Sequence, residues 1–474
     1  MARATGASRA AGGPLAFSSV STDTRTLVPG ALYVALKGDR LDGHTFLAEA
    51  AAKGAAAAVV RVGTTAAPGL PLIEVEDTLF ALGALAAFHR RRFSIPVAAV
   101  GGSAGKTTTK EMVAAILRAR GPALAAEGNF NNEIGVPLTL LELGRKHRAA
   151  VVELGMSAPG ELARITAIAR PDAAVLTLIA AEHLEFLKDL DGVAEAEGEL
   201  YRGLLPGSVA VVNVDDARCV TQAERVVRGV RRISFGKSAK ADVRLVGLTS
   251  LGMDGMNICL EGEEGLRGAG GERRGKNLQR SRVDVRLGFV GEHNAMNAAA
   301  AAALALSLSY TFEEISRGLS LARPFAHRLR VVAGAGGITI LDDCYNASPA
   351  SMEAALATLA GLTVPGSSRA IAVLGDMLEL GEAEESAHRE LGRSARKRVD
   401  AAAFFGPRSL HSFEEFSSFP SPAPASSASA HFTEIDPLLA WLRPRLQPGD
   451  TVLVKGSRGM KLERVVDALV AQPA

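Results

Sequence analysis

The residues best suited to chemistry lie at positions 97–112, in VAAVGGSAGKTTTKEM. An apolar run leads into a glycine-rich turn, and a helix-forming stretch follows directly. The N–H groups of such a turn can converge on phosphate oxygens, and the helix start adds its dipole. Lys106 would bring positive charge to the β- and γ-phosphates, and the Thr107 hydroxyl would ligate Mg²⁺. The pattern predicts a nucleoside triphosphate site, and the alternative is a structural turn with an incidental lysine.

This loop is shorter than the strict G-x-x-x-x-G-K-[ST] pattern. Val100 stands where that pattern requires its first glycine, so the remaining motif is G-x-x-G-K-T. The residues that we expect to bind the nucleotide through this loop are Gly102, Ser103, Ala104, Gly105, Lys106, Thr107 and Thr108.

Further candidate groups follow two other apolar runs. Glu153 closes the run AVVELG, and His183 stands just after the run that ends at residue 179. The ends of parallel strands can meet at one sheet edge, where a carboxylate and an imidazole could hold the cations that phosphoryl transfer needs. Taken singly, each could instead be a capping Glu or a surface His. Glu195, Glu197 and Glu199 share a predicted helix, and without further context they are typical of a solvated acidic face.

The elements that must position these groups alternate along the chain. Short β-type runs and Ala/Leu/Arg-rich helical stretches follow one another, which predicts an α/β fold with mainly parallel sheets. The strand candidates are residues 95–100, 149–154, 173–179, 208–214, 338–341, 370–374, 401–405 and 451–454. The predicted domains are residues 1–94, 95–323 and 324–474. The composition of the charged, glycine-rich segment 261–282 predicts a surface insertion. The Pro/Ser/Ala-rich segment 417–430 is typical of a flexible loop.

The composition excludes several classes of protein. Apolar residues make up 47% of the 474 residues and charged residues 22%, which excludes wholesale disorder. With 53 basic and 51 acidic residues, the net charge of +2 gives no bulk attraction to nucleic acid or to an anionic membrane. Three separated cysteines fit a reducing cytoplasm rather than a disulfide framework. Residues 1–17 lack the apolar core of a signal peptide, and the apolar stretch 298–306 is too short to span a bilayer.

Together with the phosphate loop, several further motifs resemble the Mur ligase family over almost the whole chain. They are STDTRTLVPGALYVALKGDRLDGHTF at 21–46, NFNNEIGVPLTLL at 129–141, ELGMSAPGEL at 153–162, AEHLEFL at 181–187, NVDD at 213–216, GEHNAMNAAAAAALA at 291–305, LDDCYNASPASMEAAL at 341–356, LGDMLELG at 374–381, His388 and VKGSRGMKLE at 454–463. The D-x-Y-N-A-x-P form and LGDMLELG resemble the dipeptide-adding branch of the family.

The resemblance implies three domains and one reaction. An N-terminal α/β domain would bind UDP, a central P-loop domain would bind ATP, and a C-terminal Rossmann-like domain would close over the active site. The enzyme would be a cytoplasmic, ATP-dependent peptide ligase that joins D-alanyl-D-alanine to UDP-N-acetylmuramoyl-tripeptide through an acyl phosphate. ATP and two Mg²⁺ ions would take part, and the protein would act as a monomer without nucleic-acid partners.

The resemblance also implies roles for individual residues. Lys106, Glu153 and His183 would be catalytic, and Thr107, Glu153 and His183 would hold metal. Nucleotide contacts would come from Asn294, Asn297, Arg328, Asp343, Tyr345 and Asn346. Substrate contacts would come from Asp23, Thr24, Arg25, Lys37, Asn132, Lys455, Ser457 and Arg458.

The sequence departs from the family pattern at two of these motifs. Glu197 stands where the family usually has a lysine that CO₂ converts to a carbamate. We expect the native carboxylate to take its place at the metal, directly or through water. Ser348 stands where the family usually has Asn, and we expect a tolerated change.

Two other functions remain open from the sequence. One is a related ligase that adds a single amino acid or glutamate. The other is a nucleotide-dependent switch, which would have a similar phosphate loop but no need for the N-terminal motif or the 455–458 loop.

Overall fold

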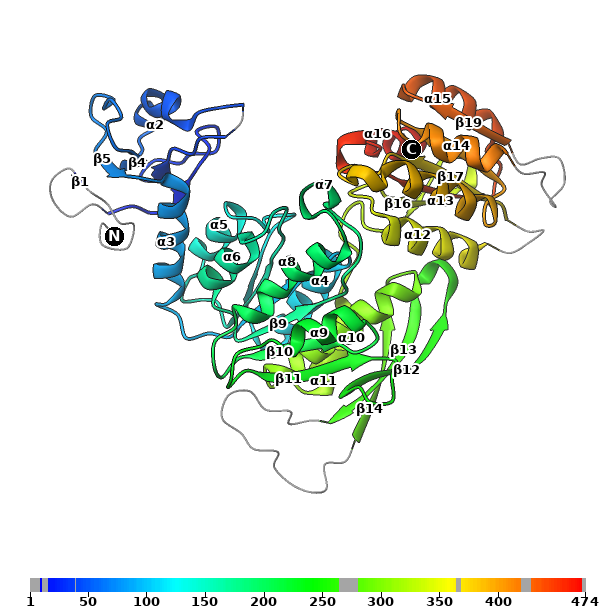
Figure 1. The fold of residues 1–474 in the computed structure, drawn as a ribbon, viewed down its shortest axis with the longest axis horizontal. Helices are drawn as coiled ribbons and strands as arrows, with labels where there is room; N and C mark the ends of the chain where they lie inside the picture. Colours follow the sequence, from blue (N-terminus) through cyan, green and yellow to red (C-terminus); the bar gives the residue numbers. More distant parts are fainter. Residues whose placement is uncertain are drawn as a thin grey trace.

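The computed structural model describes residues 9–10, 16–38, 40–263, 280–363, 368–418 and 428–470. Within these residues the chain forms three sheets, of five, nine and six strands, one after another in sequence. Figure 1 shows three bodies, with the central one between the other two. Most neighbouring strands are parallel, as the sequence predicts. The boundaries proposed at residues 94 and 323 stay predictions.

The N-terminal body is a small sheet with a helix on each face. Its strands are β1 Arg9–Ala10, β2 Val20–Ser21, β3 Leu32–Val34, β4 Ala57–Arg61 and β5 Leu72–Val75; its helices are η1 Gly43–Phe46, α2 Leu47–Ala52 and α3 Thr78–Arg90. Helix α3 starts at Asp77, whose side chain accepts the N–H groups of Leu79 and Phe80. Figure 1 shows α3 running from this body to the central one. Leu82 packs in the first body and Ala86 in the second, so α3 joins them.

The central body is a parallel sheet extended by an antiparallel hairpin. Its strands are β6 Val97–Gly101, β7 Ala123–Ala125, β8 Ala149–Glu153, β9 Ala173–Leu176, β10 Val209–Asn213, β11 Arg231–Gly236, β12 Val243–Ser250, β13 Met256–Glu263 and β14 Arg280–Leu287, in the spatial order β14-β13-β12-β11-β10-β9-β6-β8-β7. Its helices are α4 Lys106–Leu117, η2 Arg118–Arg120, α5 Gly135–Leu141, α6 Glu161–Ala169, α7 Leu184–Leu187, α8 Leu190–Arg202, α9 Ala217–Ala223, η3 Gly252–Asp254, α10 Glu292–Ser307 and α11 Phe312–Leu321.

Helices cover both faces of this sheet because its strands are apolar on both sides. In β6, Ala98 and Val100 pack toward α4, α10 and α11, whereas Val97 and Ala99 pack toward α5, α6, α8 and α9. The apolar stretch 298–306 lies in α10, where its small alanines are buried against the sheet. Among the described residues, no helix is both long and apolar enough to cross a membrane.

The C-terminal body is a second parallel sheet with one antiparallel edge strand. Its strands are β15 Arg330–Ala333, β16 Thr339–Asp343, β17 Ala370–Gly375, β18 Ala401–Phe405, β19 Ala428–Phe432 and β20 Thr451–Lys455, in the order β15-β16-β20-β17-β18-β19. Its helices are η4 Ala335–Gly337, α12 Pro349–Leu362, η5 Gly381–Ala383, α13 Glu384–Arg396, α14 Leu410–Ser417, α15 Ile435–Leu442, η6 Arg443–Arg445, η7 Arg458–Met460 and α16 Glu463–Leu469. Ser348 begins α12 through hydrogen bonds with Ser351, which gives this departure from the family pattern a helix-capping role.

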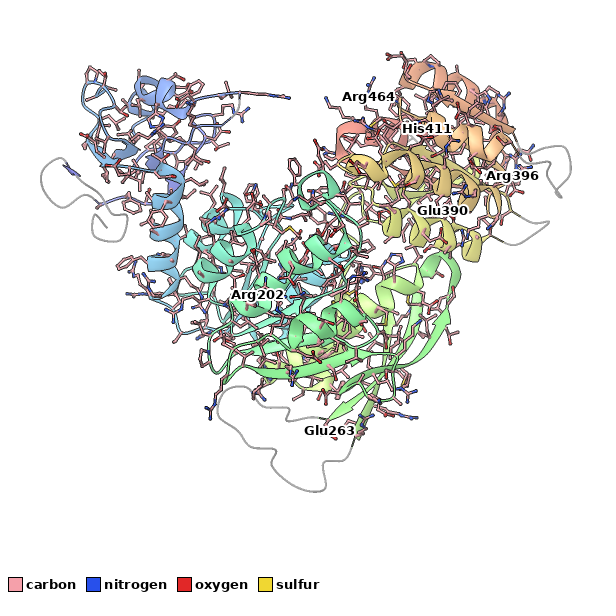
Figure 2. All side chains as sticks on the ribbon, viewed as in Figure 1. Arg202, Glu263, Glu390, Arg396, His411 and Arg464 are labelled. Atoms are coloured by element: carbon pink, nitrogen blue, oxygen red, sulfur yellow. The ribbon has the colours of Figure 1, made fainter. Side chains whose placement is uncertain are left out.

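The eight predicted strands are present, but three predicted segments differ from the structure. The strand expected at 173–179 ends at Leu176, and the hydroxyl of the next residue, Thr177, donates to Ala104 O in the phosphate loop. The predicted insertion 261–282 is strand at both ends, since Glu261 accepts hydrogen bonds from Arg280 and Arg282 on the opposing strand. Figure 2 shows Glu263 at the outer end of this hairpin. Likewise, helix α14 and strand β19 take up both ends of the predicted loop 417–430.

Several predictions fall partly outside the described residues. They concern most of the N-terminal segment 1–17, residues 264–279 of the predicted insertion and residues 419–427 of the predicted loop.

Candidate active site

The phosphate loop connects strand β6 to helix α4, and two glycines give it its shape. Gly102 has a φ of +108°, and a Cβ there would lie 2.4 Å from Thr177 Oγ1. Gly105 has a φ of +83°, and a Cβ there would lie 2.3 Å from Asn297 Oδ1. A side chain at either position would be strained and would collide with a neighbour. The glycines therefore allow the loop to lie against β9 and α10.

Side-chain and backbone contacts hold the loop in place. Ser103 N–H donates to Leu178 O at 2.8 Å, and Ser103 Oγ accepts the N–H of Ala180 at 2.9 Å. The Thr177 hydroxyl donates to Ala104 O at 2.6 Å. The segment after β9 thus fixes the loop before any ligand arrives, which is the preorganisation that phosphate binding by backbone groups needs.

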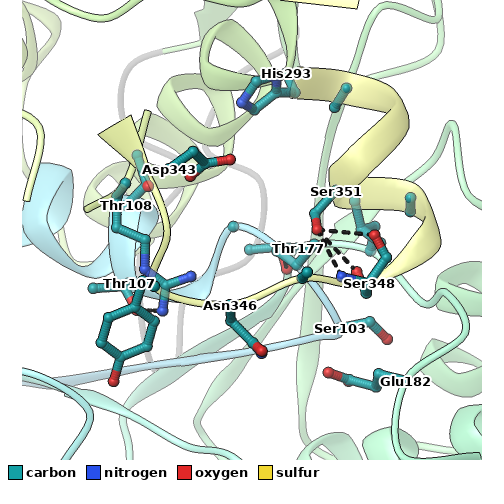
Figure 3. A pocket seen from close by; sticks show the side chains of 18 of the residues that line it. Ser103, Thr107, Thr108, Thr177, Glu182, His293, Asp343, Asn346, Ser348 and Ser351 are labelled. Carbon is teal, nitrogen blue, oxygen red and sulfur yellow. Dashed lines mark hydrogen bonds between the residues drawn. The ribbon is translucent and has the colours of Figure 1, made fainter. Parts of the chain in front are cut away.

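The loop forms one wall of a cleft of about 610 Å³ between the central and C-terminal bodies. Figure 3 shows the loop residues Ser103, Thr107 and Thr108 around the same pocket as Asp343, Asn346 and Ser348. The predicted residues that line the cleft are Ser103, Ala104, Gly105, Thr107, Thr108, His183, Asn294, Asn297, Arg328, Asp343, Tyr345, Asn346, Lys455, Ser457 and Arg458. Residues separated by more than three hundred positions in sequence thus share one cavity.

Contacts across the cleft connect the two bodies. Arg328 donates to Thr107 Oγ1 at 3.1 Å, and its guanidinium lies 3.9 Å from the centre of the Tyr345 ring. On the C-terminal side, Lys455 Nζ donates to Asp343 Oδ2 at 2.7 Å and to Asn346 O at 2.9 Å. The Ser457 hydroxyl accepts the N–H of Leu378 at 3.0 Å. The C-terminal side chains are therefore held in place facing the phosphate loop.

Lys106 is the cation of the loop, and its side chain is only partly exposed. Its Nζ lies 3.4 Å from Glu182 Oε2. Burial lowers the pKa of Lys106, but the carboxylates of Glu182, Glu197 and Glu153 outweigh burial and hold this pKa above its ordinary value. Lys106 is therefore positively charged at neutral pH and is suited to an anionic ligand.

Glu197 lies beneath the loop and is buried. Its Oε2 accepts the N–H of Gly102 at 2.9 Å. Burial raises the pKa of Glu197 to about 8, against the opposing effect of Lys106. This position excludes the solvated acidic face that the sequence alone suggests for Glu197.

Glu153 and Glu182 carry oxygen atoms without partners. Glu153 Oε1 accepts from Asn131 Nδ2 at 2.9 Å, but among the described residues Glu153 Oε2 and Glu182 Oε1 are buried and have no hydrogen-bond partner. A buried, unpaired carboxylate oxygen is costly unless something binds it. These hard oxygen donors beside a phosphate loop fit a cation such as Mg²⁺.

His183 contacts the C-terminal body instead of the other predicted metal ligands. Its Nδ1 lies 2.5 Å from Glu379 Oε2. Ligand atoms of Glu153, His183 and Glu197 do not cluster within 4.8 Å; in the described part of the chain such a cluster forms at His327, Asp342 and Cys344. The structure thus leaves the four-residue metal set of Thr107, Glu153, His183 and Glu197 a prediction.

The remaining predicted substrate residues lie away from the cleft. Asp23 and Arg25 form a two-pronged ion pair on the N-terminal body, and the backbone oxygen of Thr24 accepts from Lys53 Nζ at 2.8 Å. Lys37 is exposed beside Asp42. Asn132 Oδ1 accepts the N–H groups of residues 134 and 135 at the start of α5, which occupies that oxygen.

Sequence reasoning missed several titratable residues of the cleft. Glu182, Glu379, His293, Lys237 and Asp215 all line it. Glu182 directly precedes His183, and Glu379 lies in LGDMLELG. Both residues lie in motifs that match the family, so the sequence could have singled them out as candidates. Neither motif, however, indicates which of its side chains points into the cleft.

Together, fold and cleft define a three-domain α/β protein of the phosphate-loop class, with its site between the central and C-terminal domains. Three family models match in succession: "Mur ligase family, catalytic domain" at 16–117, "Mur ligase middle domain" at 100–305 and "Mur ligase, glutamate ligase domain" at 327–458. The chain belongs to the Mur ligase family.

Curated relatives and solved structures match over nearly the full length. The UDP-N-acetylmuramoyl-tripeptide–D-alanyl-D-alanine ligase of Escherichia coli K12 is 37% identical over 97% of this chain and 95% of its own. The ligase of the same name from Bacillus subtilis is 34% identical, over 96% and 93%. A crystal structure of MurF from Acinetobacter baumannii superposes with a TM-score of 0.85 at 32% identity, over 99% and 97%. The crystal structure of the MurF ligase of Thermotoga maritima in complex with ADP superposes with a TM-score of 0.78. It is 28% identical to this chain, and the match covers 95% of this chain and 96% of the other.

Proposed function

We propose that this chain is an ATP-dependent ligase that joins D-alanyl-D-alanine to UDP-N-acetylmuramoyl-tripeptide in peptidoglycan precursor synthesis. The observation that carries the proposal is the cleft, which has a phosphate loop on one wall and Lys455 and Arg458 on the other. A nucleotide and a peptide carboxylate can meet there. The names and coverage of the relatives support the choice of substrates.

The reaction needs ATP because a carboxylate is a poor electrophile toward an amine. The terminal carboxylate of the tripeptide attacks the γ-phosphorus, ADP leaves, and an acyl phosphate forms. The free amine of D-alanyl-D-alanine then attacks the acyl carbon, loses a proton, and expels phosphate from a tetrahedral intermediate. Lys106 stabilises negative charge on the transferring phosphoryl group, and the loop N–H groups hold the nucleotide in position.

The family also implies Mg²⁺, for which Thr107, Glu153, His183 and Glu197 are the proposed ligands, with Glu182 added by the structure. When bound, the cations neutralise charge on the phosphate oxygens. The unpartnered oxygens of Glu153 and Glu182 support this assignment.

The three domains divide the contacts to the substrates. Asp23, Thr24, Arg25 and Lys37 would hold the UDP end, while Asn294, Asn297 and Arg328 would contact the nucleotide. The peptide end would lie near Asn132 and the 455–458 loop. Such an arrangement spreads binding over three bodies, so that the reacting groups meet only when the domains are correctly placed.

The proposal is tested by measuring phosphate release from ATP with defined acceptors. We expect release only when UDP-N-acetylmuramoyl-tripeptide and D-alanyl-D-alanine are both present. Release with a single amino acid in place of the dipeptide would assign the chain to another ligase of the family. ATP hydrolysis indifferent to every acceptor would favour a nucleotide-dependent switch.

The role of Glu197 is tested by Glu197→Gln. The amide keeps the hydrogen bond from Gly102 N–H but cannot give a cation a negative charge. We expect the Mg²⁺ concentration for half-maximal activity to rise by about tenfold. Glu195→Gln, on the same helix but pointing toward Arg225 at the surface, is the matched control. Undiminished activity of the Glu197 variant at limiting Mg²⁺ would rule out this role.

Domain closure is part of the proposal, because an acyl phosphate must be kept from water. The segment 323–330 is the proposed hinge, and within it His327 and Leu329 have φ angles of +62° and +51°. Small-angle scattering with an ATP analogue and UDP-tripeptide is expected to show compaction. An unchanged radius of gyration would contradict the proposal.

We further propose a cytoplasmic monomer. Cys219, Cys259 and Cys344 are all described, and all are free thiols, as suits a reducing compartment. Light scattering of the purified chain tests the oligomeric state, with a mass near 49.2 kDa expected.

A further inference from the structure

Three potential metal ligands converge next to the cleft, at the start of the C-terminal domain. Asp342 belongs to β16, Cys344 follows that strand, and His327 precedes β15. His327 Nδ1 lies 3.1 Å from Asp342 Oδ1 and 3.5 Å from Cys344 Sγ, and this sulfur lies 3.1 Å from the same oxygen. A nitrogen, an oxygen and a sulfur atom thus form a small triangle.

The triangle has the dimensions of one face of a tetrahedral zinc site. With Zn–S, Zn–N and Zn–O bonds of about 2.3, 2.0 and 2.1 Å, tetrahedral ligand atoms are about 3.3–3.6 Å apart. The N–S separation equals the tetrahedral value, and the N–O and S–O separations are shorter than it by up to about half an ångström. Both Asp342 and Cys344 approach the same imidazole nitrogen, Nδ1. A catalytic relay would instead use the two nitrogens of the ring for two different partners.

Burial and charge also favour a cation at this point. Cys344 and Asp342 are buried, whereas the His327 side chain is 31% exposed and leaves a path from solvent. Glu463 adds negative charge: it acts on Cys344, and its Oε2 is buried without a hydrogen-bond partner among the described residues. Its other oxygen is paired with Arg458 at 3.0 Å.

We propose that His327, Asp342 and Cys344 bind one Zn²⁺ ion, with a fourth position open to water or another ligand. On binding, Cys344 releases its S–H proton to solvent, and the thiolate, the carboxylate and the neutral imidazole each donate one lone pair. The two anionic ligands balance the charge of the ion. No bond to substrate forms or breaks, so the site is independent of the proposed ligase reaction.

The site differs in kind from the magnesium site of the cleft. A thiolate and an imidazole select zinc over magnesium, which prefers oxygen ligands in octahedral geometry. Its ligands also flank residues of the cleft: Arg328 follows His327, and Asp343 stands between Asp342 and Cys344. A bound ion would therefore tie the proposed hinge to strand β16, beside the groups that face the nucleotide.

The test uses Co²⁺ as a spectroscopic substitute for Zn²⁺ on the full-length chain. We expect one equivalent of Co²⁺ to produce a near-ultraviolet thiolate-to-cobalt band, which Zn²⁺ abolishes and a large excess of Mg²⁺ does not. Cys344→Ser is expected to eliminate the band. Cys219→Ser and Cys259→Ser are matched controls that are expected to keep it.

A second variant separates ligand loss from misfolding. His327→Gly removes the imidazole, and glycine suits the positive φ at this position, so its circular dichroism and thermal transition are expected to match those of the parent chain. Its affinity for Co²⁺ is expected to fall at least tenfold. Absence of the band in the parent chain, or its survival in Cys344→Ser or in folded His327→Gly, would overturn the proposal.

Discussion

The charged groups at the phosphate loop and those of the N-terminal domain are held in opposite ways. At the loop, Glu153 and Glu197 are buried, the Lys106 side chain is 16% exposed, and one oxygen of Glu153 has no partner among the described residues. On the N-terminal domain, Asp23 and Arg25 satisfy one another at the surface, with the arginine side chain 86% exposed. The first group is arranged for a ligand whose charge it must balance. The second group can exchange an internal ion pair for a substrate contact at little cost.

The comparison predicts different kinetic effects for the two regions. Changes beneath the phosphate loop should reduce kcat, because these groups are proposed to act on the reacting atoms. Changes on the N-terminal domain should raise KM, because that domain is proposed to bind a part of the substrate remote from the reaction.

The largest effect is expected for Lys106→Met. The substitution keeps most of the length of the side chain and removes the charge that is proposed to stabilise the transferring phosphoryl group. We expect kcat to fall by about a thousandfold. Steady-state phosphate release measures it, with Lys146→Met at an exposed position of the same domain as the control. A loss below tenfold would contradict the catalytic role of Lys106.

Glu153→Gln is expected to have the next largest effect. The amide can still accept from Asn131 but cannot give a cation a negative charge, so we expect kcat to fall about a hundredfold and the Mg²⁺ requirement to rise. Activity is measured across a Mg²⁺ titration, with the exposed Glu127→Gln as control. An unchanged Mg²⁺ dependence would exclude Glu153 as a metal ligand.

In the N-terminal domain, Arg25→Gln tests the other half of the comparison. The variant loses one charge-assisted contact, which corresponds to about a tenfold rise in KM for the UDP-substrate, with kcat within about twofold. Initial rates at varied UDP-tripeptide separate the two constants, and Arg92→Gln serves as an exposed control. A fall in kcat without a change in KM would contradict the prediction that Arg25 contributes to substrate binding and not to the chemical step.

The smallest effect concerns a carboxylate outside both regions. Glu314 caps α11 and pairs with Arg120, and the hydrogen bond from Arg120 lowers the pKa of Glu314 to about 2. Solvent screens this pair, so Glu314→Gln should lower the free energy of unfolding by about 1 kcal/mol at pH 7. Since the folded-state pKa is depressed, this stabilisation is present above about pH 4.5 and is lost as the pH falls toward 2.

Urea unfolding at several pH values measures the loss for Glu314→Gln, and Glu313→Gln on the same turn is the control. The difference between the Glu314 variant and the parent chain should shrink on acidification. A difference that grows toward low pH would show that the ion pair does not cause it.

Much of the fold could be predicted because its signals are local. Apolar runs predict the strands, and the phosphate loop is a contiguous motif that includes the glycines at 102 and 105. The contacts that complete the cleft join distant positions: Lys106 meets Glu182 76 residues away, and His183 meets Glu379 196 residues away. Neither spacing nor propensity indicates such pairs. Packing of the domains also decides which carboxylate oxygens remain unpaired, as Glu153 illustrates.

The unpaired oxygens of Glu153 and Glu182 have a consequence for the lifetime of the protein. Each buried oxygen without a partner costs about 1–3 kcal/mol, and this cost is recovered only when a ligand fills the cleft. The folded state is therefore expected to be least stable without bound nucleotide, and bound ligands are expected to slow its degradation. A protease digest with and without the ATP analogue and Mg²⁺ would reveal this protection as slower cleavage of the occupied protein.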